Sequence, residues 1–515
     1  MNLKLMNYKF INFIKTNWLI ILILLVGAFL RLYKIDQYMT FLGDEGRDSI
    51  VVRNLLVHKD LFLIGPGTSV GNMYLGPLYY YLIAIPLALA NFSPVGPAVF
   101  VALLGVFTIW FVYFVGCEWF SKKAGLIASL LFAVSPTVII FSHSSWNPNI
   151  MPFFALLTVY SVWKFWKKGL YSWLVVLGIS FAFCLQSHYL GLLLAPVILL
   201  FWVWKVLRFN LAGNWTGEVA SFMRMSIFGL ITFLFLMSPL LAFDIRHNWL
   251  NTNSLVKFVT ERETTVSAKP WSALPRIPEI AENISTSLLG VGNKNLGNLI
   301  LTIVSIPSIL FVLSRKKLHK NEAEGFLFLT VWLFFGFIGF GIYKQPIYDH
   351  YFGFLFPAIF LFFAGFIDGI LENLSKIGVG LIYLLLGFLV IWNISETPIL
   401  KEPNRQMARA QNVATKIIDE SKTAEFNLAV IADSNYEDGY RYFLEKESDK
   451  VVKIDAQIEE SIKDQLFVVC EKPKEKCDPT HSPKAEVANF GWSKVESVWE
   501  VDGVIIYKLV HSKKQ

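Results

Sequence analysis

The chain has 515 residues, of which 55% are hydrophobic, 16% aromatic and 17% charged, and its mean hydropathy is +0.51. A soluble globular domain of this size is normally more polar, so the composition predicts that most of the chain lies in lipid. The formal charge of +7 could indicate nucleic-acid binding, but the Lys and Arg residues lie in short clusters between apolar runs, which is the pattern that orients membrane proteins. We therefore expect no nucleic-acid partner.

Apolar runs of transmembrane length recur along the chain. A helix needs roughly 20 apolar residues to cross the hydrocarbon core, and about eleven runs approach that length. The first, at 18–30, ends without the small-residue signature of a cleaved signal peptide, so it is expected to be an anchor helix. The expected spans are 17–33, 97–117, 123–141, 150–164, 170–187, 190–205, 223–243, 297–313, 325–342, 351–367 and 378–394.

One further apolar run, at 74–90, is short and is interrupted by Pro77 and Pro86. Short loops rich in Lys and Arg stay in the cytoplasm. If 74–90 does not span, the basic clusters share the side of the N-terminus; they are Lys4, Lys9, Lys15, Lys122, Lys123, Lys164, Lys167, Lys168, Lys205, Arg208, Arg315, Lys316, Lys317 and Lys320. We therefore expect a cytoplasmic N-terminus and an interfacial or re-entrant helix at 74–90 within a first outer loop at 33–97.

The C-terminal part of the chain differs in kind from residues 1–395, which form the expected transmembrane domain. An odd number of crossings from a cytoplasmic N-terminus places residues 396–515 outside the membrane. This tail is more charged, with a helical pattern at 404–421 and β-like runs at 427–433, 465–470 and 501–510. It is expected to be a small extracytoplasmic α/β domain.

The four cysteines do not form a disulfide framework in a chain of this length. Cys117 and Cys184 lie in apolar runs, where a thiol usually behaves as a small hydrophobic group. Cys470 and Cys477 flank the polar segment EKPKEK and could pair if the tail lies in an oxidising compartment. Two unrelated surface thiols are the alternative.

Polar residues able to do chemistry gather in the outer loops, whereas the inner loops contribute mostly Lys and Arg. Taken singly, each has an ordinary structural explanation: a lone His or Tyr at a helix end makes one hydrogen bond, and an acidic pair favours a helix N-terminus. Their convergence on one face is what indicates a site. The candidate residues are Asp44, Glu45, Arg47, Asp48, His143, Trp146, Asn147, His188, Tyr189, Asp244, Arg246, His247, Lys344, Asp349, His350 and Tyr351.

A site at the outer interface can hold a lipid tail between helices and a polar head group among the loops. If the head group is a sugar phosphate, cationic side chains would bind the phosphate, and the candidates for this role are Arg246, His247, Lys344 and His350. Asp44 would act as the general base that removes a proton from the acceptor hydroxyl, and Glu45 would orient Asp44 or contact the acceptor.

At these residues the sequence resembles the GT-C class of membrane glycosyltransferases, in particular the protein O-mannosyltransferase and aminoarabinose-transferase-like group that uses polyprenyl-phosphate sugars. The resemblance rests on the DE pair after the first helix, on GPLYYYLIAIPLALANF, and on GCEWFSKKAGLIASLLFAVSPTVIIFSHSSWNPN. It is clearest over 18–200 and extends in hydropathy to about 395. It implies that Asp44 is catalytic with Glu45 as its companion, and that the first outer loop contains interfacial helices.

The sequence departs from the usual family pattern in two places. DEGRDSI replaces DEGYYA or DEAYY, and GPL at 76–78 replaces PPL, so Arg47 and Asp48 leave the acceptor preference open. Within the wider class some enzymes need a divalent ion and others do not. Asp44, Glu45, His143 and His247 lack tight ligand spacing, so we expect no required metal while a divalent ion stays open.

Two other functions compete with this prediction. A secondary transporter would place ionisable residues near the bilayer midplane, whereas Glu118 and Asp368 fall at predicted helix ends. A polysaccharide polymerase or ligase would favour a large late outer loop, for which 244–296 is a candidate. We predict a multi-pass cell-membrane enzyme that transfers a hexose or pentose from a polyprenyl phosphate to a protein, lipid or glycan on the outer face. The sequence leaves the sugar, the acceptor, the partners of the tail domain and the oligomeric state open.

Overall fold

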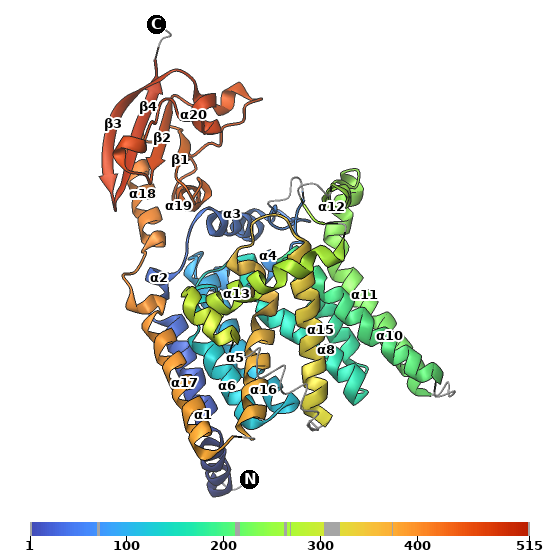
Figure 1. Ribbon diagram of the computed structural model, residues 1–515. Coiled ribbons are helices and arrows are strands. Elements are labelled where there is room, and N and C mark those ends of the chain that lie inside the picture. Colours follow the sequence, from blue (N-terminus) through green and yellow to red (C-terminus); the bar gives the residue numbers. More distant parts are fainter. Residues whose placement is uncertain are drawn as a thin grey trace.

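The structure is a computed structural model that describes residues 3–68, 73–211, 217–261, 265–267, 269–302, 320–372 and 374–512. A helical bundle forms the larger part, and a small domain with a sheet lies at one end of it (Figure 1). The helices of the first half are α1 Leu3–Leu32, α2 Ile35–Tyr38, α3 Gly43–His58, α4 Leu78–Leu89, α5 Val95–Trp119, α6 Lys122–Val134, α7 Pro136–Ile140, η1 Asn147–Ile150, α8 Met151–Lys168, α9 Trp173–Ser187, η2 Tyr189–Leu194 and α10 Ala195–Leu211.

The second half of the bundle continues with long helices joined by shorter outer segments. These elements are α11 Gly217–Arg246, α12 Leu250–Thr260, η3 Pro270–Arg276, α13 Ile277–Leu288, α15 Lys320–Ile342, η4 Asp349–Leu355, α16 Phe356–Leu371, α17 Lys376–Ser395 and η5 Pro398–Leu400. The expected span at 297–313 is described only as far as residue 302. The basic cluster at 315–317 lies outside the described residues.

Seven helices of the described chain are long and apolar enough to cross a membrane, and they support a multi-pass membrane protein. They are Ile14–Leu32, Val95–Trp119, Tyr189–Leu211, Gly217–Arg246, Asn321–Ile342, Asp349–Leu371 and Lys376–Ser395. The expected span at 123–141 is divided into α6 and α7 at Pro136, whose ring cannot continue a helix. The expected number of about eleven crossings is therefore not confirmed.

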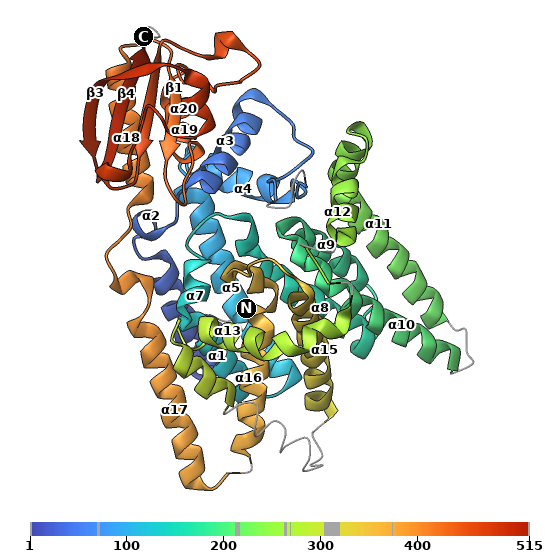
Figure 2. The ribbon, with the colours of Figure 1, turned by 45° about the horizontal axis from the view of Figure 1, so that its top comes forward.

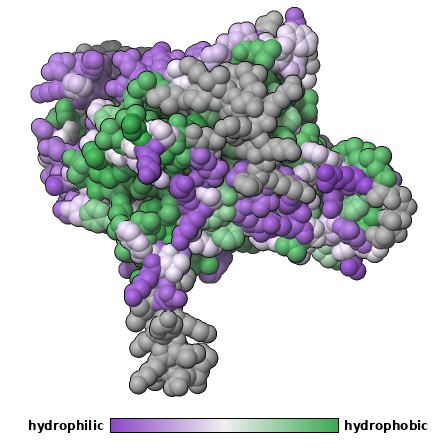
Figure 3. Space-filling model, turned by 60° about the horizontal axis from the view of Figure 1, so that its bottom comes forward, coloured by the Kyte–Doolittle hydropathy of each residue, from purple (hydrophilic) through white to green (hydrophobic). Residues whose placement is uncertain are grey.

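The outer helices of the bundle expose large apolar side chains. Phe235 on α11 and Leu384 on α17 are both 73% exposed, and only 11% and 17% of the apolar windows of these two helices are buried. Such surfaces are rare on soluble monomers but suit contact with lipid. Figure 3 shows broad hydrophobic areas on the bundle.

The first outer loop folds into α2, α3 and α4 at the end of the bundle opposite the N-terminus (Figure 1). Helix α4 begins directly after Pro77 and has 12 residues, which gives a length of about 18 Å, too short for a hydrocarbon core of roughly 30 Å. The expectation of helices in this loop, including a non-spanning one within 74–90, agrees with the structure.

The C-terminal domain is an α/β unit whose sheet has the strand order β1-β2-β4-β3. Strands β1 and β2 are parallel, and β4 is antiparallel to both β2 and β3. Its elements are α18 Gln406–Ser421, β1 Asn427–Ile431, α19 Asp438–Glu447, η6 Glu459–Ser461, β2 Gln465–Cys470, η7 Lys474–Lys476, α20 Ala485–Phe490, β3 Ser493–Val501 and β4 Val504–His511. The predicted run at 501–510 contains the turn and most of the second strand of a hairpin. Asp502 and Gly503 both have positive φ and form the turn between β3 and β4.

Cys470 and Cys477 form a disulfide, whereas Cys117 and Cys184 are free. The bridge joins the end of β2 to the segment after η7. The open question of whether the two tail cysteines pair is thus answered by the fold.

The C-terminal domain packs directly against the outer-loop helices. Figures 1 and 2 show α19 beside α3, and the two helices are in extensive contact. One hydrophobic cluster unites Phe41 and Ile50 from the outer loop with Tyr442 and Phe443 from α19. The hydroxyl of Tyr442 also donates a hydrogen bond to the carbonyl oxygen of Phe92 at 2.5 Å. The domain is therefore anchored on the first outer loop.

Candidate active site

Asp44 lies in the first turn of α3, where the sequence predicts the catalytic carboxylate. Leu42 is extended and precedes the helix, and its backbone N–H donates to Glu45 Oε2 at 3.0 Å. This side-chain bond satisfies a donor that the helix start leaves unpaired, and the Asp44 carboxylate interacts favourably with the helix dipole. The acidic pair therefore sets where α3 begins and places Asp44 at its exposed end.

The Asp44 carboxylate is 38% exposed and is held through one oxygen. Its Oδ1 accepts hydrogen bonds from Arg47 Nη1 at 2.8 Å and from the hydroxyl of Tyr436 at 2.6 Å. Arg47 also pairs with Asp48 through Nη2 at 2.8 Å. Arg47, which the sequence offered as a substrate-binding residue, thus bridges two carboxylates of its own helix.

The other two carboxylates of α3 are buried. Burial raises the pKa of Glu45 from 4.5 to about 8, against the hydrogen bond from the Leu42 backbone. Burial also raises the pKa of Asp48 to about 6, an effect that the Arg47 guanidinium opposes. Glu45 therefore carries a proton near neutral pH. Asp44 is left as the most exposed carboxylate of the motif.

A cluster of aromatic and imidazole rings from three outer loops lies close to Asp44. Ring centroids are 4.6 Å apart for Trp146 and His350, 4.5 Å for His350 and Tyr351, and 4.9 Å for His188 and Tyr351. The charge of Asp44 acts on the His350 ring, which places α3 near this cluster. The predicted convergence of outer loops is therefore realised for these residues.

Two candidates from the 142–149 loop have structural partners. His143 is 2% exposed, and its Nε2–H donates to the Leu30 carbonyl oxygen at 2.9 Å. Burial lowers the pKa of His143 to about 4, so its ring is neutral. Asn147 Nδ2 donates to the carbonyl oxygen of Ser187 at 2.7 Å. Both residues brace the loop that carries Trp146.

Asp244 and Tyr189 belong to a second network. Buried Asp244 accepts from the backbone N–H groups of Asn251 at 2.6 Å and Thr252 at 3.0 Å, which caps the start of α12. The Tyr189 hydroxyl donates to the carbonyl oxygen of Tyr74 at 2.5 Å and accepts from Asn251 Nδ2 at 2.8 Å. This network ties the segment before α4 to α12.

The remaining candidates lie on the surface. Arg246 and His247 are exposed at the end of α11, and the His247 ring stacks on Phe243 with centroids 4.1 Å apart. Lys344 and Asp349 are exposed in the loop between α15 and α16. These side chains are accessible to solvent. Within the described parts of the chain, no group of three or more His, Cys, Asp or Glu side chains is placed to hold a metal ion.

Two residues of this region carry no signal in the sequence. Arg31 is fully buried, and its Nη1 donates to the carbonyl oxygen of Ala133 at 2.9 Å while its Nε donates to Ser142 Oγ at 3.3 Å. Tyr436 lies in the loop between β1 and α19. Neither an isolated Arg near a helix end nor a Tyr in a polar loop is distinguishable from a surface residue without the fold.

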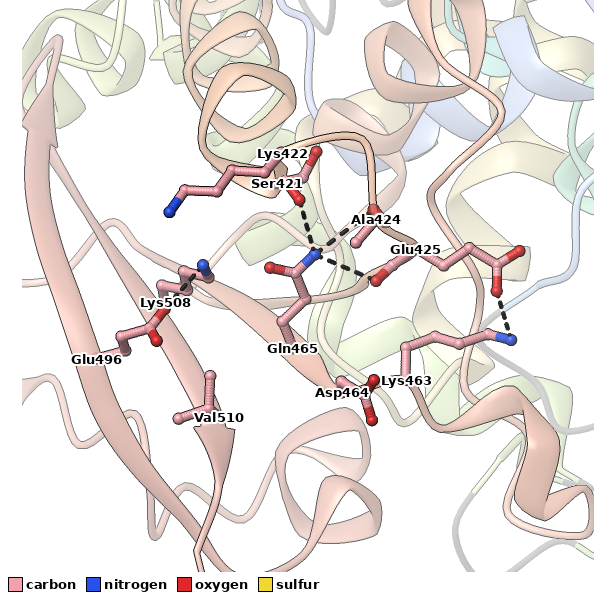
Figure 4. A pocket seen from close by; sticks show the side chains of 10 residues that line it. All are labelled: Ser421, Lys422, Ala424, Glu425, Lys463, Asp464, Gln465, Glu496, Lys508 and Val510. Atoms are coloured by element: carbon pink, nitrogen blue, oxygen red, sulfur yellow. Dashed lines mark hydrogen bonds and ion pairs between the residues drawn. The ribbon is translucent and has the colours of Figure 1, made fainter.

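A separate hollow of about 440 Å³ lies in the C-terminal domain (Figure 4). Two of its three lysines pair with acids, Lys463 with Glu425 at 2.7 Å and Lys508 with Glu496 at 2.7 Å. It lies at the amino ends of β1 and β2, whereas Tyr436 follows the carboxyl end of β1. The hollow is therefore at the edge of the sheet away from α3.

Part of the chain matches a glycosyltransferase family model, in agreement with the resemblance seen in the sequence. Residues 75–242 match the family model described as dolichyl-phosphate-mannose-protein mannosyltransferase. This match begins after α3, so it does not include Asp44. A search of curated proteins finds no match to the sequence.

Solved structures extend the likeness to almost the whole chain. The crystal structure of ArnT from Cupriavidus metallidurans bound to undecaprenyl phosphate is 12% identical with a TM-score of 0.60, and the alignment covers 96% of this chain and 98% of that one. The archaeal oligosaccharyltransferase AglB from Archaeoglobus fulgidus, in complex with an inhibitory peptide and a dolichol-phosphate, is 13% identical with a TM-score of 0.52, covering 84% of this chain and 64% of that one. At these identities the likeness establishes the fold.

Proposed function

We propose that this protein transfers a sugar, a hexose or a pentose, from a polyprenyl-phosphate donor to an acceptor on the outer face of the membrane. The observation that carries the proposal is the exposed Asp44 carboxylate, beside the ring cluster and within a GT-C fold. The polyprenyl phosphates bound to ArnT and AglB support the choice of donor.

Asp44 is the base in this reaction. The acceptor hydroxyl attacks the anomeric carbon of the sugar, its proton passes to Asp44, and the bond between that carbon and the phosphate oxygen breaks. The electron pair of this bond leaves with the polyprenyl phosphate. Glu45, which is protonated near neutral pH, holds the start of α3 in this scheme and thereby fixes Asp44.

The phosphate of the leaving group needs cationic partners. Arg246, His247 and Lys344 are exposed at the outer end of the bundle and would stabilise its negative charge through charge-assisted hydrogen bonds. The sugar would pack against the aromatic faces of Trp146 and Tyr348, the latter 56% exposed. No step of this scheme uses a metal ion. That the enzyme requires no metal remains an expectation.

The proposed orientation has a cytoplasmic N-terminus and an extracytoplasmic C-terminal domain. The N-terminus and the C-terminal domain lie at opposite ends of the bundle (Figure 1). The Cys470–Cys477 disulfide supports an oxidising environment for this domain. Transport is disfavoured, because Glu118 pairs with Lys164 at 3.0 Å and Asp368 with Lys123 at 3.7 Å near helix ends.

The test is transfer from a panel of radiolabelled polyprenyl-phosphate sugars in membranes that carry the wild type or Asp44→Asn. Labelled acceptor is expected with the wild type and should be lost in Asp44→Asn, with both proteins eluting alike in detergent gel filtration. Asp60→Asn is a control, because this exposed carboxylate of the same loop is not among the candidate site residues. Equal transfer by wild type and Asp44→Asn would remove Asp44 as the base. The absence of transfer from every donor would reject the proposed function.

A further inference from the structure

The C-terminal domain reaches the proposed catalytic carboxylate. The hydroxyl of Tyr436 donates to Asp44 Oδ1 at 2.6 Å, although the two residues are 392 positions apart in the sequence. The same hydroxyl lies 3.4 Å from Arg47 Nη1, which donates to the same oxygen at 2.8 Å. Asp44, Arg47 and Tyr436 thus form a triangle in which a residue of the outer domain completes the surroundings of the base.

The close approach of the C-terminal domain to α3 depends on glycines on both surfaces. A Cβ on Gly43 would lie 2.3 Å from the Tyr436 ring, and a Cβ on Gly46 would lie 2.2 Å from the Asp438 carbonyl oxygen. On the other side, a Cβ on Gly439 would meet the Leu42 backbone at 3.2 Å. Real Cβ atoms are not found as close as the first two distances. The loop that carries Tyr436 therefore sits on α3 only because these positions are glycine.

Further hydrogen bonds fix the loop within its own domain. The backbone N–H of Tyr436 donates to Asn435 Oδ1 at 2.9 Å, and Asn435 Nδ2 donates to Glu471 Oε1 at 2.6 Å. Tyr440 also donates to Glu471 Oε1 at 2.6 Å. Asn435 and Glu471 follow the carboxyl ends of the parallel strands β1 and β2, the edge at which open α/β sheets usually place functional groups. Tyr436 is consequently held by a rigid sheet edge.

We propose that Tyr436 is a positioning residue for Asp44, and that the C-terminal domain is part of the active site through this contact. The inference rests on the proposed function, in which Asp44 is the base. Two donors hold Oδ1, and among the described residues no hydrogen bond reaches Oδ2. Oδ2 is therefore the oxygen that faces the acceptor hydroxyl, and Tyr436 fixes its direction while stabilising the ionised carboxylate.

Tyr436→Phe tests this role, because it removes the hydroxyl and keeps the ring that packs on Gly43. Tyr442→Phe is the matched control, since it removes another interdomain hydrogen bond, to the Phe92 carbonyl oxygen at 2.5 Å, without touching Asp44. Charged and titratable groups around Asp44 that contribute to a pH profile are Glu45, Arg47, Asp48, Tyr80, His350, Tyr436 and Asp438. Transfer is measured from pH 5 to 9, with kcat and the KM for the donor determined separately.

Tyr436→Phe is expected to lower kcat about tenfold, because a hydrogen bond to a charged group is lost. The KM for the donor should stay within about twofold, because Tyr436 does not bind the donor in this scheme. Tyr442→Phe should change none of these quantities. Gly43→Ala, which displaces the ring from the other side of the contact, should reproduce the loss of kcat with Tyr436 intact.

Three outcomes would overturn the inference. Identical profiles for the two Phe variants, with Asp44→Asn inactive, would leave Tyr436 a docking residue only. A rise in kcat for Tyr436→Phe would mean that its hydroxyl competes with the acceptor for Asp44. Wild-type kcat in a well-folded Gly43→Ala would show that the contact is not needed. Full activity in Asp44→Asn would instead remove Asp44 as the base, and the absence of transfer from every donor would reject the proposed function itself.

Discussion

The burial of Glu45 predicts a pH-dependent stability that its replacement by glutamine should remove. Burial raises the pKa of Glu45 from 4.5 to about 8. Above pH 4.5 the unfolded chain releases this proton while the folded chain keeps it, so a rising pH favours unfolding. Between pH 4.5 and 8 each pH unit is worth about 1.4 kcal/mol, so the free energy of unfolding should fall by about 5 kcal/mol across this window.

Glu45→Gln stays neutral and retains an oxygen that accepts the hydrogen bond of the Leu42 N–H. The variant should match the wild type near pH 5 and be more stable at pH 8, with donor transfer preserved at neutral pH. The measurement is the midpoint of thermal unfolding in detergent from pH 5 to 8.5. Glu402→Gln, at an exposed glutamate, serves as the control and should follow the wild type. Parallel curves for wild type and Glu45→Gln would refute a neutral, buried Glu45.

Two predictions concern the stability of the outer segments. Asp244→Ala removes the acceptor of the Asn251 and Thr252 N–H groups, so it should lower the free energy of unfolding by about 2 kcal/mol. The change would be measured as a lower midpoint of thermal unfolding. Arg246→Ala, at an exposed residue, is the control and should change the midpoint little. Cys477→Ser opens the disulfide with Cys470, seven residues away, and should cost about 2.5 kcal/mol. A reductant should lower the midpoint of the wild type by the same amount and leave Cys477→Ser unchanged; an equal effect on both proteins would contradict the second prediction.

The contact between the domains gives the C-terminal domain a role in the proposed chemistry. Its helix α19 shares a hydrophobic cluster with the outer loop, and its Tyr436 reaches Asp44. In this arrangement, movement of the domain away from α3 would remove one of the two donors to Oδ1. In this proposal, the docking of the C-terminal domain on α3 therefore affects the orientation of the Asp44 carboxylate.

The sequence determined the elements whose signals are local. Long apolar runs predict the spanning helices because lipid selects hydrophobicity along every turn, and the strands β1 and β2 follow from short apolar runs between polar turns. The position of Asp44, in an acidic pair soon after the first helix, and the convergence of His188, His350 and Tyr351 were also predictable from loops assigned to one side. The turn at Asp502 and Gly503 was missed, although an Asp-Gly pair is itself a hairpin signal.

Only the tertiary structure decided which polar residues meet. His143, Asn147 and Asp244 look like site residues in the sequence, but in the fold their side chains bond to backbone groups of other segments. Tyr436 looks like any tyrosine in a polar loop, yet it contacts Asp44. Hydropathy and periodicity record the surroundings of a residue along the chain, whereas such contacts depend on the packing of segments hundreds of residues apart.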